Sequence, residues 1–258
     1  MTETEDQNPA PGAPGFRVER HGAVPSTNTL AFERARAGDL GHIWMTATEQ
    51  TAGRGRRGRH WASNQGNLFA SLLLINPAPT NRLPELPMVA AVALSKAIDL
   101  ATGGYHLAKL KWPNDLLVSG AKLSGILLEA ETLVDNRTAV VLGFGVNCVT
   151  HPHDALYPCT DLAALGYRVS AEDLFHHLAS SLADELATWN SSNGFSQIRS
   201  GWLERAAHLR QQVTVRNGDE AVTGQFHNLD DRGHLVLKLD NGSLKTIFAG
   251  DVFLPEQG

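Results

Sequence analysis

Residues 67–75, with the sequence NLFASLLLI, constrain the fold of this chain more than any other segment. Consecutive apolar side chains on a strand face both sides of a sheet, so this strand should be buried on both faces. The helix expected over residues 86–104 is long, rich in alanine and ends at two glycines, and it can cover one face. With 258 residues and 42% hydrophobic content, the chain can bury such a core.

Other short apolar runs predict that the sheet extends beyond this strand. A short strand begins near Phe16, and further strands are expected at 42–50, 107–112, 115–118, 122–131 and 138–147. Helices are expected at 28–37, 171–189 and 195–208, the second with a capping box formed by Ser170 and Asp173. This succession predicts an α+β fold with a mixed central sheet flanked by helices.

The two ends of the chain differ from its middle. Residues 1–15 are polar, acidic and rich in Pro and Gly, which predicts a loose, disordered tail. From about Gln211 the pattern changes to short strands separated by turns such as Asn217-Gly218. We therefore expect a main domain over 16–209 and a small β-barrel-like domain over 210–258.

Composition narrows the functional classes. The net charge of −5, from 22 Lys and Arg against 27 Asp and Glu, argues against broad affinity for nucleic acid. No export signal and no apolar run of membrane-spanning length is found, so the cytoplasm is the expected location and no membrane partner is expected.

Four thiol and imidazole groups lie close together in the sequence: Cys148, His151, His153 and Cys159. Such groups can surround zinc, but their spacing matches no standard zinc motif. A loop containing proline is the favoured interpretation, and no metal site is predicted.

The segment Thr51–Arg59, TAGRGRRGR, should form a loop between two strands. It has the glycine spacing of a phosphate loop but not the following Lys-Ser/Thr, and GFGVNC at residues 143–148 lacks the third glycine of a dinucleotide fingerprint. The four arginines of Thr51–Arg59 can nevertheless bind an anion, and the glycines of this segment allow an anion to approach the backbone closely. Because like charges repel, we expect the loop to be mobile without ligand and ordered over an anionic one; a solvated basic loop is the alternative.

Two further constellations accompany this loop. Lys111 and Lys122 end two short strands around the turn Asn114-Asp115, so both cations can reach one rim of the sheet, although either lysine alone could be merely exposed. Gly125 marks a place where a ligand can touch the backbone. Ser26, Thr27 and Asn28 precede a helix and can cap it, but they can also bind a polar ligand head.

These residues resemble a known family. The motifs STN, EQTAGRGRRGRHW, KWPNDL, KLSGILLE and GFGVN occur between Ser26 and Asn147 in the order seen in biotin protein ligases, and the C-terminal region ending FAGDVFL is similar to that family's SH3-like domain. The resemblance implies a fold like that of biotin ligases and class II synthetases. It also implies that biotin and ATP, with Mg²⁺ accompanying ATP, give biotinyl-5′-AMP, from which biotin passes to a lysine on the biotin carboxyl carrier domain of a carboxylase.

The resemblance also implies roles for individual residues. Ser26, Thr27 and Gln50 would bind the ureido head of biotin, with Asn28 beside them, Gly125 contributing its backbone and Trp61 walling the site. Arg54, Gly55 and Arg56, next to Gly53, would hold the adenylate, with Lys122 on its phosphate and carboxyl oxygens. The remaining residues that the motifs place at the sheet rim are Lys111, Asn114, Asp115 and Asn147.

Arg56 and Lys122 are predicted to be catalytic, and replacing either by Ala should cost on the order of 3 kcal/mol in adenylation. Arg57 and Arg59 are expected to matter less, as solvated neighbours.

Some family members carry an N-terminal winged helix-turn-helix, for which we see no room before Phe16, so a monofunctional ligase without DNA binding is expected. The rival enzyme is a lipoate or octanoate ligase or transferase, whose substrate lacks a ureido head. A nucleic-acid-binding module is disfavoured by charge, and a scaffold without chemistry does not account for two cation-rich rims.

Overall fold

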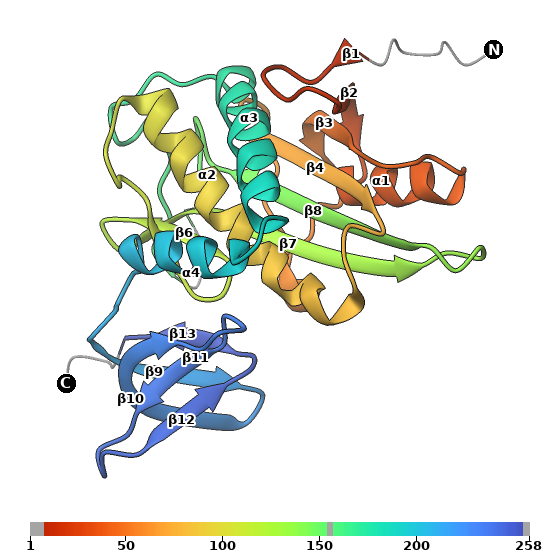
Figure 1. Cartoon of the computed structure of the whole chain (residues 1–258). Helices are drawn as coiled ribbons and strands as arrows, with labels where there is room; N and C mark the ends of the chain where they lie inside the picture. The colour runs from red at the N-terminus through yellow and green to blue at the C-terminus, as the bar shows by residue number, and fades with distance from the viewer. Residues whose placement is uncertain (1–7, 154–156, 255–258) are drawn as a thin grey trace.

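The computed structural model describes residues 8–153 and 157–254 (Figure 1). Within these residues, the larger part of the chain contains an eight-stranded sheet with four α-helices, and the remainder forms a five-stranded antiparallel sheet. The strands of the large sheet are β1 (Asn8–Pro9), β2 (Arg17–Val24), β3 (Ile43–Gln50), β4 (Leu68–Ile75), β5 (Lys109–Lys111), β6 (Asp115–Val118), β7 (Ala121–Thr132) and β8 (Thr138–Val146). The helices are α1 (Thr27–Arg36), α2 (Leu86–Thr102), α3 (Ala171–Trp189) and α4 (Gly194–Glu204). Short 3₁₀ turns lie at Arg56–Gly58 and Thr80–Glu85.

The large sheet is mixed, as predicted. Its order is β1-β2-β3-β4-β8-β7-β6-β5, with β2 and β3 parallel and every other neighbouring pair antiparallel. Alternate residues of β3 and β4 point to opposite faces. Trp44 and Leu72 pack with α2 and α3, whereas Met45 and Leu73 pack with α1. The sequence prediction that β4 is buried on both faces is therefore confirmed.

Local signals explain where the helices begin and end. Ser170 caps α3 by accepting a hydrogen bond of 3.0 Å from the backbone N–H of Asp173, and α2 ends at Gly103, whose φ of 69° suits glycine. Helix α4 ends at Glu204, earlier than predicted. Its continuation leaves the helix because Ala206 forms a parallel bridge with Leu110 of β5.

The disordered tail predicted for residues 1–15 is wrong for the part that can be described. β1 pairs antiparallel with β2, and Ala10 and Ala13 are only 4% and 1% exposed in the main core. Isolated alanines among prolines and glycines give no periodic signal, so the sequence could not indicate this docking. Residues 1–7 lie outside the described residues.

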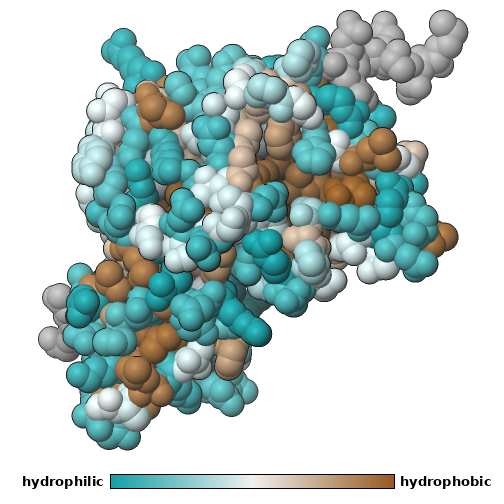
Figure 2. All heavy atoms as spheres, in the orientation of Figure 1, coloured by the Kyte–Doolittle hydropathy of each residue, from teal (hydrophilic) through white to brown (hydrophobic). Residues whose placement is uncertain are grey.

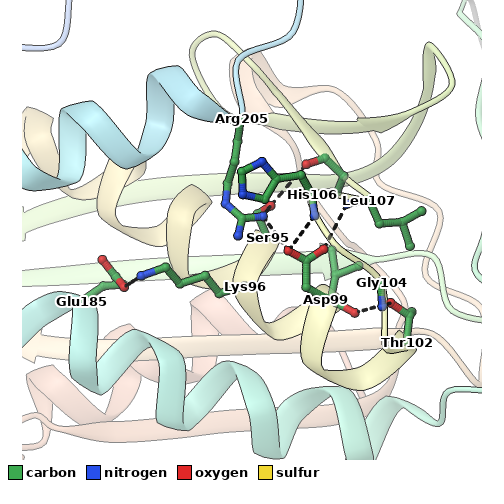
Figure 3. A network of polar contacts seen from close by, with 11 residues as sticks. Ser95, Lys96, Asp99, Thr102, Gly104, His106, Leu107, Glu185 and Arg205 are labelled. Atoms are coloured by element: carbon green, nitrogen blue, oxygen red, sulfur yellow. Dashed lines mark hydrogen bonds and ion pairs between the residues drawn. The ribbon is translucent and has the colours of Figure 1, made fainter.

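A buried polar network fixes the segment that follows α4 (Figure 3). The Arg205 guanidinium donates to the Ser95 hydroxyl (2.9 Å) and to the Asp99 carboxylate (2.7 Å), both on α2. Asp99 also accepts from the backbone N–H groups of His106 and Leu107, each at 3.0 Å. The network thus joins the end of α4 to the chain that enters β5.

The small C-terminal sheet has the order β12-β11-β10-β9-β13. Its strands are β9 (Gln212–Asn217), β10 (Glu220–Leu229), β11 (Leu235–Lys238), β12 (Leu244–Ile247) and β13 (Asp251–Phe253). The sheet docks on the large domain partly through the Trp112 indole N–H, which donates to the Gly233 carbonyl at 3.1 Å. Figure 2 shows hydrophobic atoms on the visible face of this small domain, whose exposed large apolar side chains include Phe248 and Phe253.

No helix within the described part of the chain is both long enough and apolar enough to cross a bilayer.

Candidate active site

A cavity lies on the face of the large sheet that also carries α1. On this face β8 presents Gly143 and Gly145, and the neighbouring β7 presents Gly125, which pairs with Gly145. Because glycine has no side chain, these positions leave a hollow in an otherwise covered sheet. The cavity that remains has a volume of about 70 Å³, below the roughly 300 Å³ typical of small-molecule sites. The surrounding side chains therefore fill most of the space.

The cavity brings together most of the residues that the sequence singled out. Those that line it are Ser26, Thr27, Asn28, Gln50, Arg54, Gly55, Arg56, Trp61, Asn114, Asp115, Lys122 and Gly125. We call Ser26, Thr27, Asn28 and Gln50 the head end of the cavity, after the polar ligand head that they were expected to bind. We call Arg56, Arg59 and Lys122 its cationic end. The two cation-rich rims predicted from sequence thus share one cavity.

Three predicted site residues do not line the cavity: Gly53, Lys111 and Asn147. The Gly53 carbonyl accepts the Trp61 backbone N–H at 3.0 Å, and a Cβ there would lie 2.4 Å from the Ser63 hydroxyl. Asn147 is buried and donates through its amide to the Thr160 carbonyl at 3.0 Å. Both residues shape the loops that surround the cavity rather than its wall.

Lys111 lies at the junction with the small domain. Its Nζ is 5.5 Å from the centre of the Phe253 ring in β13. Burial lowers the pKa of Lys111, the neighbouring charge of Lys122 adds to the lowering, and Asp115 opposes it. Lys122 lines the cavity and Lys111 does not, so the structure does not bring both lysines to the cavity.

The head end consists of neutral hydrogen-bonding groups. The Gln50 side-chain oxygen accepts from the Thr27 backbone N–H at 2.9 Å and lies 3.2 Å from the Thr27 hydroxyl, while its amide nitrogen donates to Ser63 at 3.1 Å. Ser26 occupies the N-cap position of α1, yet its side chain makes no capping hydrogen bond. Ser26 thus lines the cavity, and its side chain has no role in capping the helix.

Trp61 forms a large part of the cavity wall. A Cβ on Gly145 would lie 2.4 Å from the indole, and one on Gly125 would lie 3.2 Å from it. The indole therefore rests directly on the glycine hollow. Its N–H is buried without a hydrogen-bond partner among the described residues, so a ligand acceptor could satisfy it.

The cationic end is held by polar partners from several strands. Arg56 donates to the Asn114 side-chain oxygen at 2.8 Å, and the Lys122 ammonium lies 2.8 Å from the Asp115 carboxylate. The same ammonium is 5.4 Å and 5.2 Å from the ring centres of Trp61 and Tyr157. Burial lowers the pKa of Arg56 below its ordinary value, although Asp251 and Asp115 oppose the shift.

Asp251 of β13 in the small domain places a negative charge beside the arginine loop, Thr51–Arg59. Arg59 donates a hydrogen bond to it, and guanidinium nitrogens of Arg56 and Arg57 each lie 3.6 Å from its carboxylate. Burial alone would raise the pKa of Asp251, but the hydrogen bond and charge of Arg59, together with the other two arginines, lower it. Arg57 and Arg59 are exposed to solvent, as the sequence indicated, and both also pair with Asp251.

Carboxylates within the chain offset the repulsion that we expected among the arginines. Asp251 contacts three of them, and the fourth, Arg54, lies 3.6 Å from the Glu129 carboxylate. Arg54 also donates to the Thr29 hydroxyl at 3.2 Å. Ordering of the loop over a ligand stays a prediction, and it now requires that arginines exchange a carboxylate for the ligand.

The Cys and His residues weighed for zinc do not converge. His151 contacts the Asp161 carboxylate at 2.5 Å, and burial raises the pKa of Cys148 to about 12. Within residues 8–153 and 157–254, no group of three or more His, Cys, Asp or Glu side chains is arranged to hold a metal ion.

Sequence reasoning missed several residues at the cavity. Tyr157 and Asp251 line it, and Ser71 supports its head end from β4. None of them belongs to a local motif that signals a ligand. They reach the site only through the pairing of strands and the docking of the small domain, so a single sequence carried no signal for them.

Comparison with known proteins identifies the family. The biotin/lipoate A/B protein ligase family matches residues 22–147, and the biotin protein ligase C terminal domain matches residues 208–254. A biotin–[acetyl-CoA-carboxylase] ligase of Paracoccus denitrificans is 37% identical over 234 residues, which cover 88% of this chain and 96% of that protein. This chain belongs to the biotin protein ligase family. The resemblance of its sequence motifs is thereby confirmed.

A further relative and a solved structure support this membership. The bifunctional ligase/repressor BirA of Bacillus subtilis is 30% identical, with 93% of this chain and 74% of that protein covered. The solved structure of the Aquifex aeolicus biotin protein ligase in complex with biotin and ATP superimposes with a TM-score of 0.77 at 26% identity, covering 92% of this chain and 97% of that one. The fold class predicted from sequence, including the small C-terminal domain, is confirmed.

Proposed function

We infer that this chain is an ATP-dependent biotin protein ligase that forms biotinyl-5′-AMP and transfers biotin to a lysine of an acceptor protein. The observation that carries this inference is one cavity with a neutral, hydrogen-bonding head end and a cationic end. Biotin has the matching polarity, because its ureido head is neutral and its carboxylate is negative. ATP brings further negative charge to the cationic end.

In the first step, a carboxylate oxygen of biotin attacks the α-phosphorus of ATP. The bond from that phosphorus to the bridging oxygen breaks, and pyrophosphate leaves with the electron pair. Negative charge gathers at the α-phosphate, where Arg54, Arg56 and Lys122 supply positive charge. Mg²⁺ would accompany ATP, held by its phosphates, and would reduce their negative charge.

In the second step, the uncharged amine of the acceptor lysine attacks the carbonyl carbon of the mixed anhydride. The bond from that carbon to the phosphate oxygen breaks, AMP leaves, and the amine gives its extra proton to water. Until the acceptor arrives, Trp61 and the arginine loop exclude water from the anhydride. Gly55 allows the backbone of this loop to approach the phosphate.

The proposed acceptor is the biotin carboxyl carrier domain of an acetyl-CoA or related acyl-CoA carboxylase. The name of the Paracoccus relative supports a carboxylase acceptor. The exposed Phe253, beside Lys111 and next to Asp251, offers apolar contact near the cavity. We place the reaction in the cytoplasm, and the net charge of −5 supports a ligase that does not bind DNA.

The deciding experiment incubates the full chain with biotin, ATP, Mg²⁺ and a purified carrier domain. Mass spectrometry should detect one biotin on a single lysine, and an acceptor that stays unmodified would contradict the proposal. Pyrophosphate exchange measured with biotin and with lipoate separates this function from the rival lipoate ligase. Exchange should depend on biotin, because lipoate has no ureido head to satisfy Thr27 and Gln50.

A further inference from the structure

Glu129 of β7 connects the head end of the cavity to the arginine loop. It does not line the cavity, and 33% of its side chain is exposed. Its carboxylate accepts a hydrogen bond of 2.7 Å from the Asn28 side-chain nitrogen and lies 3.6 Å from a guanidinium nitrogen of Arg54. Glu129 therefore contacts residues on two walls of the site without lining the cavity itself.

The carboxylate fixes how Asn28 is oriented. An ionised carboxylate only accepts hydrogen bonds, so the NH₂ group of Asn28 must face Glu129 and its oxygen must face Ser71. The Asn28 oxygen and the Ser71 hydroxyl are 2.6 Å apart. Because an amide oxygen can only accept, the hydroxyl of Ser71 must donate its single proton to Asn28.

The same reasoning extends to the cavity wall. The hydroxyl oxygens of Ser71 and Thr27 are 2.7 Å apart. Since the proton of Ser71 is used on Asn28, the contact between the two hydroxyls needs the hydroxyl of Thr27 to donate to Ser71. The Gln50 side-chain oxygen, 3.2 Å from the Thr27 hydroxyl, then keeps the Thr27 backbone N–H at 2.9 Å as its donor. Thr27 then keeps both of its lone pairs, and it lines the cavity. The reverse direction would leave the buried Asn28 oxygen without a donor from Ser71, which is unfavourable.

We propose that Glu129 is a positioning residue that fixes the direction of this hydrogen-bond chain, so that Thr27 accepts from an N–H group of the ligand. This inference rests on the proposed function, because the ureido ring of biotin supplies such an N–H. The chain runs from Thr27 through Ser71 and Asn28 to Glu129, and every proton in it points away from the cavity.

The test compares Glu129→Gln, Ser71→Ala and the double variant in the full-length chain. Glu131→Gln is the matched control, because Glu131 lies two residues further along β7 and pairs with Arg36 of α1, away from the cavity. Isothermal titration calorimetry measures the Kd of biotin, and biotin-dependent pyrophosphate exchange gives KM and kcat. A thermal melt of each variant verifies that it is folded.

Glu129→Gln and Ser71→Ala should each raise the Kd and the KM for biotin about tenfold with little change in kcat. The double variant should also lose only about tenfold, because both changes interrupt one chain. Glu131→Gln should bind like the wild type. Wild-type affinity in Glu129→Gln, a hundredfold additive loss in the double variant, or an equal loss in Glu131→Gln would each overturn the inference. If the wild type itself shows no biotin-dependent exchange, the proposed function fails instead.

Discussion

The head end of the cavity is built from neutral groups within one domain, whereas the cationic end is built from charged groups that two domains share. Thr27, Asn28 and Gln50 are held by short hydrogen bonds between α1 and neighbouring strands. Arg56 and Arg59 are held by Asp251, which belongs to the small domain. Satisfied neutral groups can stay in place when a ligand binds, but cations bound to an internal carboxylate must change partners. The comparison indicates a preorganised head end and a cationic end that rearranges.

The largest effect should come from the cationic end. Arg56→Ala and Lys122→Ala should each lower kcat/KM for adenylation about a hundredfold, on the order of 3 kcal/mol, because each removes a donor to charge that grows in the transition state. Biotin-dependent pyrophosphate exchange measures this loss. Arg20→Ala, which removes an exposed ion pair with Glu172, is the control and should retain the wild-type rate. Undiminished exchange in either cavity variant would contradict the assignment.

Filling the glycine hollow should have a smaller effect, which is a loss of biotin affinity. Gly145→Ala should weaken biotin binding by about 2 kcal/mol, because its Cβ would lie 2.4 Å from the Trp61 indole in a strand that cannot shift freely. Gly22→Ala in β2, outside the cavity, is the matched change, since no atom lies within 4 Å of its Cβ. Calorimetric titration with biotin compares the two. Equal affinity in both variants would show that the hollow does not receive the ligand.

The head end should respond with a selective loss of biotin affinity. Thr27→Val keeps the shape of the side chain but removes its hydroxyl, and we expect the Kd of biotin to rise about tenfold, roughly 1.5 kcal/mol. The KM for ATP should not change, because the hydroxyl is separated from the cationic end. Thr51→Val, at an exposed position, serves as the control. A parallel rise in the KM for ATP would break the distinction between the two ends.

The smallest effect concerns the domain junction and depends on pH. The folded-state pKa of Asp251 lies below the ordinary value of 3.8, so its contribution to stability is complete above that pH and is lost as the pH falls through the folded-state pKa. Asp251→Asn should therefore cost less than about 1 kcal/mol at pH 6, because the carboxylate is partly exposed, and nothing once wild-type Asp251 is protonated. Urea unfolding between pH 6 and pH 3 measures the difference. A cost that is constant over this range would exclude the ionic role.

The sequence predicted those parts of the molecule that depend on local pattern. The apolar run of β4, the capping residue of α3 and the glycine after α2 were sufficient to place these elements. The glycine-rich arginine loop was also recognisable, because few structural roles require such a composition. These signals are local, and a single sequence displays them directly.

The other contacts of the site and the fold join residues that are far apart in the sequence, and no local pattern encodes such contacts. Asp251 is separated from Arg59 by 192 residues, and Glu129 from Asn28 by 101. Ala10 and Ala13 reach the main core through backbone hydrogen bonds to Phe16 and the pairing of β1 with β2. Lys111 matched a motif, yet the small domain covers its ammonium with Phe253. The sequence could therefore name the chemistry of the site, but the strand register and the domain contact decide which side chains reach the cavity.

The position of Trp61 allows intrinsic tryptophan fluorescence to report ligand binding to this protein. Of its five tryptophans, Trp44, Trp112, Trp189 and Trp202 are buried in the core, whereas Trp61 rests in the glycine hollow. A molecule that enters the hollow must displace or repack this indole, which changes the polarity around one fluorophore and leaves the other four as a constant background. Emission from the unlabelled chain would then follow occupancy in real time, and Trp61→Phe would silence the signal.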